Sequence, residues 1–369
     1  MRAGPHGQKM DGSKMRSVLV SSTELYSGKS ALCMALAMKL KENELKVGYM
    51  KPVGNIIVDH HGELVDDDAV NMKKMLGLDE SLDQVSPILF THQLLEDVLD
   101  GKDKQLPAKL KKAFQQVSAS KDVMVLEGAG DVSGSSVLGL SDSDVARITG
   151  SKILLVSKYC DEYTVDRILT YLKLLTPETE ILGIVFNNTS PERINFVKEK
   201  VVPYFERIGV PVLGVIPRNR ALQTITAREI ADGLNGEVLA GKDNMGVSVE
   251  NIVVGAMAPD SAIKVFRRKH NRAVITGGDR ADLQLAALEA RMRIILLSGN
   301  LYPPAPVLGR AEELGVPVIL TADDTTTLVD RMETLLRRVR VKNVQKIDLM
   351  KNMFDENVDT DRIIKSLTE

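Results

Sequence analysis

The chain has 369 residues, which is long for one domain and favours two. Hydrophobic residues make up 44% of it, enough for buried cores, and the net charge of −2 excludes the strongly basic composition typical of nucleic-acid-binding proteins. Only two cysteines occur, far apart, which argues against a disulfide framework or a zinc site and favours a reducing cytoplasm.

Residues 1–15 are polar and lack a hydrophobic core segment, so they predict a disordered lead-in and not a signal peptide. No apolar run approaches the roughly 18 residues that a membrane span needs. We therefore expect a cytoplasmic protein whose partner is a small molecule, with no nucleic-acid or membrane partner.

The most informative stretch follows the lead-in. A short apolar run at 18–20 breaks into a polar turn, and Gly28-Lys29-Ser30 then opens a helix that is apolar on every side. A helix start exposes unpaired N–H groups and the positive end of the helix dipole, so an anion binds there. Glycine allows close approach of the backbone, lysine reaches the β- and γ-phosphates, and the serine hydroxyl can bind Mg²⁺. The pattern predicts an ATP and Mg²⁺ site, although Thr23 stands where the phosphate-loop motif has its first glycine. The alternative is a helix cap in a polar loop.

A second strand is predicted at residues 45–52, with Lys51 near its end. Lys51 either directs its ammonium group to the same phosphates or is a surface lysine. A polar segment then leads through Asp66, Asp67 and Asp68 into a helix that ends near Gly77. Acidic residues favour the first turn of a helix, so a solvated helix start is the commoner interpretation; the alternative is that one of the three binds the metal.

Residues 122–130 form the next clear element, an apolar strand that ends in Glu127 and a glycine-rich turn. A carboxylate at the end of a buried strand beside a phosphate loop is where an ATPase holds Mg²⁺ or a water, while the alternative is a helix-capping acid. Regular alternation of strands and helices follows. Strands are expected at 152–156, 181–187 and 211–216. Such apolar strands predict a parallel sheet covered on both faces, an α/β sandwich with ligands at the carboxyl ends of its strands.

Residues 233–246 contain four glycines and no long apolar run, which predicts a linker between a first domain at 16–232 and a second, smaller α/β domain at 247–343. In the second domain, a strand at 273–276 ends in a loop that either binds an anion or makes a tight turn. The residues of this possible ligand site are Gly277, Gly278, Asp279 and Arg280. Residues 344–369 predict a charged helical tail.

Five motifs, in order, resemble those of dethiobiotin synthetase-like P-loop enzymes. They lie at residues 22–30, 49–53, 126–130, 183–187 and 213–217. The second half resembles the DRTGG domain through residues 273–280 and 317–327, and the pair of domains is similar to the N-terminal, non-catalytic part of long phosphate acetyltransferases. The chain stops where their acetyltransferase domain would begin, so we do not expect that activity.

The resemblance implies Lys29, Lys51 and Glu127 as catalytic residues and Ser30, Glu127 and Asp68 as ligands of Mg²⁺. It also implies a nucleotide-binding set in which Asn187 lies near the base. That set comprises Thr23, Glu24, Ser27, Gly28, Lys29, Ser30, Ala31, Asn187 and Pro217.

Enzymes of this group use ATP to phosphorylate a carboxylate or carbamate, and many are homodimers. The resemblance thus implies an ATP- and Mg²⁺-dependent phosphoryl-transfer or ligase-type enzyme that acts on a small acid, with the second domain binding a regulatory ligand or pairing subunits. The alternative is a non-catalytic ATP sensor of acyl or acetyl metabolism. Residues 56–65 do not match the substrate segment of dethiobiotin synthetases well, which leaves the acid open.

Overall fold

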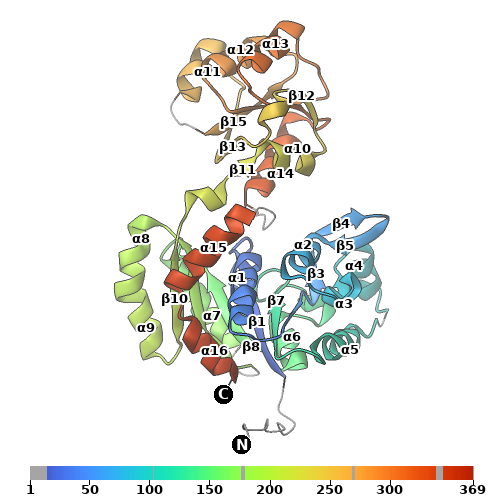
Figure 1. Cartoon of the computed structure of the whole chain (residues 1–369), viewed down its shortest axis with the longest axis vertical. Helices are drawn as coiled ribbons and strands as arrows, with labels where there is room; N and C mark the ends of the chain where they lie inside the picture. Colours follow the sequence, from blue (N-terminus) through green and yellow to red (C-terminus); the bar gives the residue numbers. More distant parts are fainter. Residues whose placement is uncertain (1–14, 103, 176–178, 268–270, 338–343, 369) are drawn as a thin grey trace, which may run out of the picture. The chain divides into compact units, whose positions relative to one another are not determined.

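The computed structural model describes residues 15–102, 104–175, 179–267, 271–337 and 344–368. Most of the expected lead-in lies outside these ranges. The chain forms two compact units, of which the first comprises Met1–Arg218 and Val341–Glu369 and the second comprises Asn219–Arg340 (Figure 1). The second unit is therefore an insertion in the first. In the part of the chain that the structure describes, no helix is both long and apolar enough to cross a lipid bilayer.

A six-stranded sheet forms the centre of the first unit. Its strands are β1 (Arg16–Ser22), β2 (Val47–Met50), β7 (Val123–Glu127), β8 (Lys152–Ser157), β9 (Ile181–Thr189) and β10 (Val212–Pro217). Their order is β10-β9-β8-β1-β7-β2, and every neighbouring pair is parallel. This confirms the expected parallel α/β sheet and places the ends of β1 and β7 side by side, because Val20 of β1 pairs with Glu127 of β7.

Helices cover the sheet because its strands are apolar on both faces. They are α1 (Lys29–Glu42), α2 (Asp67–Leu76), α5 (Leu106–Ser118), α6 (Asp142–Thr149), α7 (Tyr163–Leu175), α8 (Pro191–Phe196) and α9 (Val202–Arg207), the last two joined by a π-helical turn. Between β2 and α5 lie smaller elements that the sequence did not predict. They are the hairpin β4 (Ile57–His60) and β5 (Glu63–Asp66), the short strands β3 (Val53–Gly54) and β6 (Ile88–Leu89), and α3 (Leu82–Val85). Helix α4 (His92–Leu99) follows β6.

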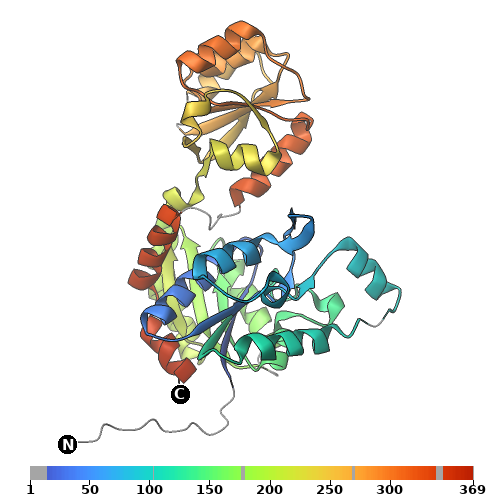
Figure 2. The same cartoon turned by 45° about the vertical axis from the view of Figure 1, so that its right-hand side comes forward.

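The C-terminal segment is helical, as predicted, and belongs to the first unit. Its helices α15 (Val344–Asn357) and α16 (Thr360–Thr368) lie beside α1 and β10, as the red and blue helices in Figure 2 show. Phe354 and Ile363 are buried, and Lys39 of α1 pairs with Asp355 at 3.3 Å. The segment therefore completes the core of the first unit.

The second unit has its own five-stranded sheet. Its strands are β12 (Glu237–Ala240), β14 (Asn251–Val254), β15 (Arg272–Gly277), β16 (Ile294–Ser298) and β17 (Val318–Leu320). Their order is β12-β17-β16-β15-β14, with only β12 antiparallel to its neighbour. Its helices are α10 (Ala227–Leu234), α11 (Pro259–Phe266), α12 (Ala281–Glu289), α13 (Ala305–Glu313) and α14 (Thr325–Arg337). Two further short strands, β11 (Ile225–Thr226) and β13 (Ser248–Val249), pair with each other in antiparallel fashion. The loops after β15, β16 and β17 share one edge of this sheet, because these strands are parallel.

The prediction of a linker at 233–246 is wrong. This segment contains the end of α10 and all of β12, and the second unit begins earlier, at Asn219. Its glycines permit close packing: a Cβ at Gly236 would meet the Ile319 side chain, and Gly241 has a φ of 68° and lies against Pro317. Glycine content there reflects contact between backbone and neighbouring strands, not an absence of structure.

Candidate phosphate and metal site

The loop between β1 and α1 has the backbone that the Gly-Lys-Ser motif requires. Gly28 has a φ of 93°, a conformation that favours glycine, and a Cβ there would clash with the side-chain amide of Asn187. Asn187 comes from β9 and donates from Nδ2 to the Ser27 carbonyl at 2.8 Å. Asn187 therefore supports the phosphate loop itself; its expected position near the nucleotide base stays a prediction.

Lys29 opens α1 and is only 9% exposed. Its Nζ donates to Ser22 Oγ at 2.8 Å and to the Gly130 carbonyl, so it bridges the ends of β1 and β7. Burial lowers the pKa of Lys29, and the nearby carboxylates of Asp142 and Glu127 oppose that effect. A phosphate oxygen at this position would replace neutral acceptors with a negative one and so stabilise the buried ammonium group.

Ser30 and Glu127 meet beside this lysine. The Ser30 hydroxyl donates to Glu127 Oε1 at 2.6 Å, and Tyr49 Oη of β2 donates to Oε2 at 2.7 Å. Glu127 is 2% exposed, and burial together with the charge of Asp68 raises its pKa, although Lys51 and the two hydroxyl donors partly offset this. Tyr49 was not predicted as a site residue, because its contact with Glu127 depends on the pairing of β2 with β7.

Lys51 follows β2 and is 1% exposed, which excludes the interpretation as a surface lysine. Its Nζ lies 2.6 Å from Asp68 Oδ2 and 3.1 Å from Asp66 Oδ1. Burial lowers its pKa, but the charges of Asp68, Glu127 and Asp66 together raise the pKa of Lys51 above its ordinary value. Lys51 is therefore a cation held between three carboxylates.

The three consecutive aspartates have different surroundings. Asp66 caps α2 by accepting from the Ala69 N–H at 3.0 Å, and its Oδ2 accepts two further N–H groups at 3.0 Å from residues 55 and 56. Asp68 instead faces Lys51 and is close enough to Glu127 to raise the pKa of that carboxyl. Asp66 is thus mainly a structural cap, and Asp68 is the one placed with Glu127.

The donor set of Ser30, Glu127 and Asp68 fits Mg²⁺ in chemistry, because this ion prefers hydroxyl and carboxylate oxygens and takes its other ligands from phosphates and water. The charge of Asp68 raises the pKa of the buried Glu127 carboxyl, and a divalent cation between the two groups would offset that repulsion. Within the described ranges, no group of three or more His, Cys, Asp or Glu side chains is placed to hold a metal ion. A bound Mg²⁺ would therefore depend on the nucleotide for part of its coordination.

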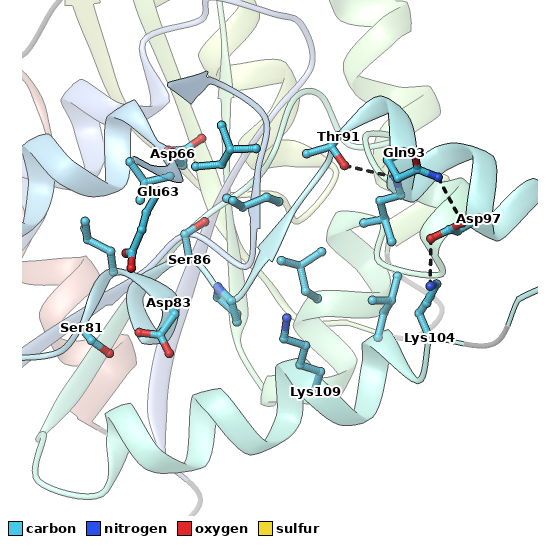
Figure 3. Close-up of a pocket in the computed structure, with 18 residues that line it drawn as sticks. Glu63, Asp66, Ser81, Asp83, Ser86, Thr91, Gln93, Asp97, Lys104 and Lys109 are labelled. Atoms are coloured by element: carbon cyan, nitrogen blue, oxygen red, sulfur yellow. Dashed lines mark hydrogen bonds and ion pairs between the residues drawn. The ribbon is translucent and has the colours of Figure 1, made fainter. Parts of the chain in front are cut away.

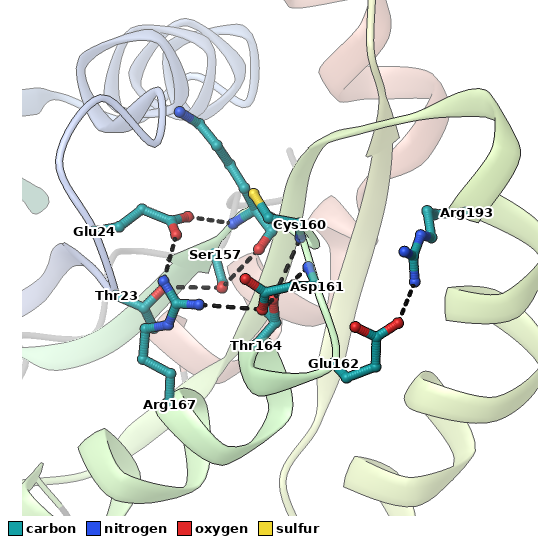
Figure 4. Close-up of polar contacts among 10 residues, drawn as sticks. Thr23, Glu24, Ser157, Cys160, Asp161, Glu162, Thr164, Arg167 and Arg193 are labelled. Carbon is teal, nitrogen blue, oxygen red and sulfur yellow. Dashed lines mark hydrogen bonds and ion pairs between the residues drawn. The ribbon is translucent and has the colours of Figure 1, made fainter.

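The first half of the phosphate loop is attached to β8 and α7 (Figure 4). Thr23 donates from Oγ1 to Ser157 Oγ at 2.8 Å. Glu24 accepts from the Lys158 N–H at 2.6 Å and pairs with Arg167 at 3.4 Å. The structure therefore places Thr23 and Glu24 as anchors of the loop.

The remaining predicted nucleotide residues vary in position. Ser27 and Ala31 are buried within the loop and α1. Among the residues that the structure describes, the Ser27 hydroxyl oxygen has no hydrogen-bond partner, as expected of a group beside a ligand. Pro217 ends β10, the edge strand, three strands away from β1. The expected part of Pro217 in nucleotide binding stays a prediction.

Asp142 is a site residue that sequence reasoning missed. It lies at the start of α6, is 2% exposed, and accepts from the Ser21 hydroxyl, while its carboxylate occupies the space where Gly128 would carry a Cβ. Burial raises its pKa to about 7, against the effects of the Ser21 hydrogen bond and Lys29. The only sequence signal was a run of Ser and Asp typical of a helix start.

In the second unit, the loop at 277–280 packs closely against its surroundings. Gln284 donates to the carbonyls of Gly277 and Gly278 at 2.9 and 3.0 Å, and the Leu301 carbonyl occupies the position of a Gly278 Cβ. Arg280 is paired with Asp282 at 3.0 Å. These contacts favour a tight turn; a ligand here remains a proposal.

Comparisons with known proteins also divide the chain into two parts. A family model described as an AAA domain matches residues 16–226, and one described as a DRTGG domain matches residues 229–335. The phosphate acetyltransferase of Synechocystis sp. is 24% identical over 367 residues, which cover 95% of this chain and 52% of that protein. The ATP-dependent dethiobiotin synthetase BioD of Methanocaldococcus jannaschii is 23% identical over 206 residues, covering 54% of this chain and 92% of that protein. The chain thus spans about half the length of the curated phosphate acetyltransferases it matches.

Solved structures also match in part. The cell division ATPase MinD of Pyrococcus furiosus aligns over 57% of this chain and 86% of its own, with 18% identity and a TM-score of 0.34. The CBS and DRTGG domains of a Clostridium perfringens pyrophosphatase, complexed with the activator diadenosine tetraphosphate, align over 32% of this chain and 49% of their own, with 22% identity and a TM-score of 0.27.

Proposed function

Because the chain belongs to the AAA domain family whose model spans residues 16–226, with a DRTGG domain after it, we propose that it is an ATP- and Mg²⁺-dependent phosphoryl-transfer or ligase-type enzyme acting on a small carboxylate or carbamate. One observation carries the proposal: four side chains converge at the adjoining ends of β1, β2 and β7, with Lys29, Lys51 and Glu127 buried and Ser30 partly buried. The similarity to a dethiobiotin synthetase over 92% of that enzyme supports it.

In this proposal each side chain has a separate task. Lys29 exchanges Ser22 and the Gly130 carbonyl for phosphate oxygens, and Ser30, Glu127 and Asp68 hold Mg²⁺, which neutralises phosphate charge. Lys51 orients the acid and offsets the charge of the transferred phosphoryl group. The protein's contribution is then positioning and charge neutralisation in a site from which water is largely excluded.

The test is ADP formation by the purified chain with ATP, Mg²⁺ and a panel of small carboxylates and amines with bicarbonate. We expect turnover with at least one member, and Lys29→Ala should abolish it because the ammonium group is lost from the phosphate site. Lys74→Ala removes an exposed lysine of α2 and is the matched control. No turnover across the panel, with ATP still bound, would contradict the enzymatic proposal.

A second candidate is a non-catalytic ATP sensor of acyl or acetyl metabolism. The observation that favours it is the match of 95% of this chain to only 52% of a phosphate acetyltransferase. In this proposal the loop at 277–280 binds a regulatory ligand, and nucleotide binding reports to a partner. Tight ATP binding with negligible turnover, and a change of oligomeric state measured by light scattering, would support it.

The homodimer and the cytoplasmic location are also proposals. The resemblance to dethiobiotin synthetases suggests the dimer, and light scattering of the purified chain tests it. The location is suggested by Cys33 and Cys160, which are both free thiols.

A further inference from the structure

The first unit contains a cavity of about 700 Å³ bounded by β5, α3, α4 and α5 (Figure 3). Its volume lies within the roughly 300–1,000 Å³ typical of small-molecule sites. None of Lys29, Ser30 and Glu127 lines it, so it is separate from the phosphate site. Asp66 lines it and also contacts Lys51, so the cavity adjoins the site where we place the acid.

Much of the cavity surface is aliphatic. Leu64 of β5 is 58% exposed although its neighbour Val65 is buried, and Leu82 and Leu94 line the cavity from α3 and α4. Aliphatic side chains that stay in contact with water in a concave site gain free energy when an apolar group covers them. The body of a ligand that fits this surface is therefore aliphatic.

The charged groups of the cavity sort into paired and unpaired ones. Asp97 is offset by Lys102 at 2.7 Å and by Lys104 at 2.9 Å. Asp66 is likewise offset by Lys51. These two carboxylates are already satisfied and are poor partners for a ligand.

Three charged side chains of the cavity lack such a partner in the part of the chain that is described: Glu63, Asp83 and Lys109. Of the residues placed by the structure, none forms an ion pair with these three side chains. In Figure 3 the Glu63 and Asp83 carboxylates lie to the left of the Lys109 ammonium group, which is drawn between them and the Asp97–Lys104 pair. A ligand that satisfies both sides carries a cation and an anion at separate ends.

Ser86 adds a neutral polar group. It lines the cavity and is 4% exposed, and its hydroxyl oxygen has no hydrogen-bond partner within the described part of the chain. Buried hydroxyl groups are nearly always paired, but this oxygen is closed off from the cavity and lies against Gly54, where a Cβ would meet it at 2.7 Å. Ser86 therefore closes the cavity wall and offers no hydrogen bond to a ligand.

We propose that this cavity binds a small zwitterion with an aliphatic body, of the size of a hydrophobic dipeptide. Its ammonium group faces Glu63 and Asp83, its carboxylate faces Lys109, and its side chains cover the leucines. The cavity is an effector or accessory site in addition to the proposed nucleotide site.

Calorimetric titration of the full chain with three probes of one skeleton tests this proposal. The probes are L-leucyl-L-leucine, its N-acetyl derivative, which lacks the cation, and its amide, which lacks the anion. We expect the dipeptide to bind up to about fivefold more tightly than either derivative, because Glu63, Asp83 and Lys109 are exposed and ion pairs at exposed sites are weak. Lys109→Met should remove the preference for the dipeptide over its amide, and Asp83→Asn should reduce the preference over the N-acetyl form.

Lys112→Met and Asp79→Asn are matched controls, because both residues are exposed and outside the cavity. They should leave all three affinities unchanged. ATP binding by the Lys109→Met protein shows that the variant is folded and keeps this test independent of the proposed function. The proposal is overturned if the dipeptide gives no heat at millimolar concentration, if the three probes bind equally, or if Lys109→Met and Lys112→Met behave alike.

Discussion

Replacement of Asp142 by asparagine should stabilise the protein at pH 8 much more than at pH 4. Asp142 is 2% exposed, and burial raises its pKa from 3.8 to about 7. The folded state therefore retains a proton between these pH values that the unfolded state has lost, so the contribution of this group to stability is full below pH 3.8 and is lost as the pH rises through 7. The difference in pKa is 7 − 3.8 = 3.2, which at 1.36 kcal/mol per unit gives an upper value of about 4 kcal/mol.

Asparagine does not titrate, and its carbonyl oxygen still accepts from the Ser21 hydroxyl. Urea unfolding followed by circular dichroism between pH 4 and pH 8 measures the stability difference between the variant and the wild type. That difference should grow with pH and level off above pH 7, while Asp79→Asn, an exposed control, should show no such trend. A difference that is the same at pH 4 and pH 8 would refute the assignment of a buried, protonated Asp142.

Three further predictions follow from the packing of the first unit. Tyr49→Phe removes the 2.7 Å hydrogen bond to Glu127, and hydrogen bonds to a charged group contribute about 1.5–3 kcal/mol. ATP affinity should therefore fall at least about tenfold in the presence of Mg²⁺ but not in EDTA. An equal fall in both conditions would contradict a role of Tyr49 in positioning Glu127 as a metal ligand. Gly28→Ala places a Cβ against the Asn187 amide and forces alanine into a φ of 93°, which costs about 1–2 kcal/mol. ATP binding should be abolished. Unchanged affinity in calorimetry would show that the loop is not held in this conformation. Phe354→Ala removes a buried side chain of α15 and should destabilise the first unit by about 3–5 kcal/mol in thermal unfolding. An unchanged transition would mean that α15 is not part of that core.

The sequence was sufficient for the features that depend on local chemistry. Gly28, Lys29 and Ser30 adjoin one another in the chain, and the strand before them and the apolar helix after them are readable from hydrophobic pattern alone. Glu127 could be placed because parallel strands end at one edge, so a carboxylate after a buried strand has few other positions. The sheet, most of its helices and the meeting of Ser30 with Glu127 could be predicted from these signals.

Features that depend on distant contacts could not be predicted. Tyr49 looks like an ordinary strand residue until β2 pairs with β7, and Asp142 looks like a helix cap until α6 packs against the turn at Gly128. The glycines at 236 and 241 suggested a linker because composition does not distinguish a flexible backbone from a closely packed one. The cavity bounded by β5, α3, α4 and α5 could not be predicted from the sequence either, because its charged residues lie far apart in the chain.

Calorimetric titration of the wild-type chain and of Lys29→Ala with ATP in the presence of Mg²⁺ tests the phosphate site most directly. The wild type should bind with a heat that EDTA diminishes, Lys29→Ala should bind at least about a hundredfold more weakly because a buried charge-assisted contact is lost, and Lys74→Ala should match the wild type. If the wild type gives no heat with any nucleoside triphosphate, or if Lys29→Ala binds as tightly as the wild type, the loop at 23–30 is not a phosphate site.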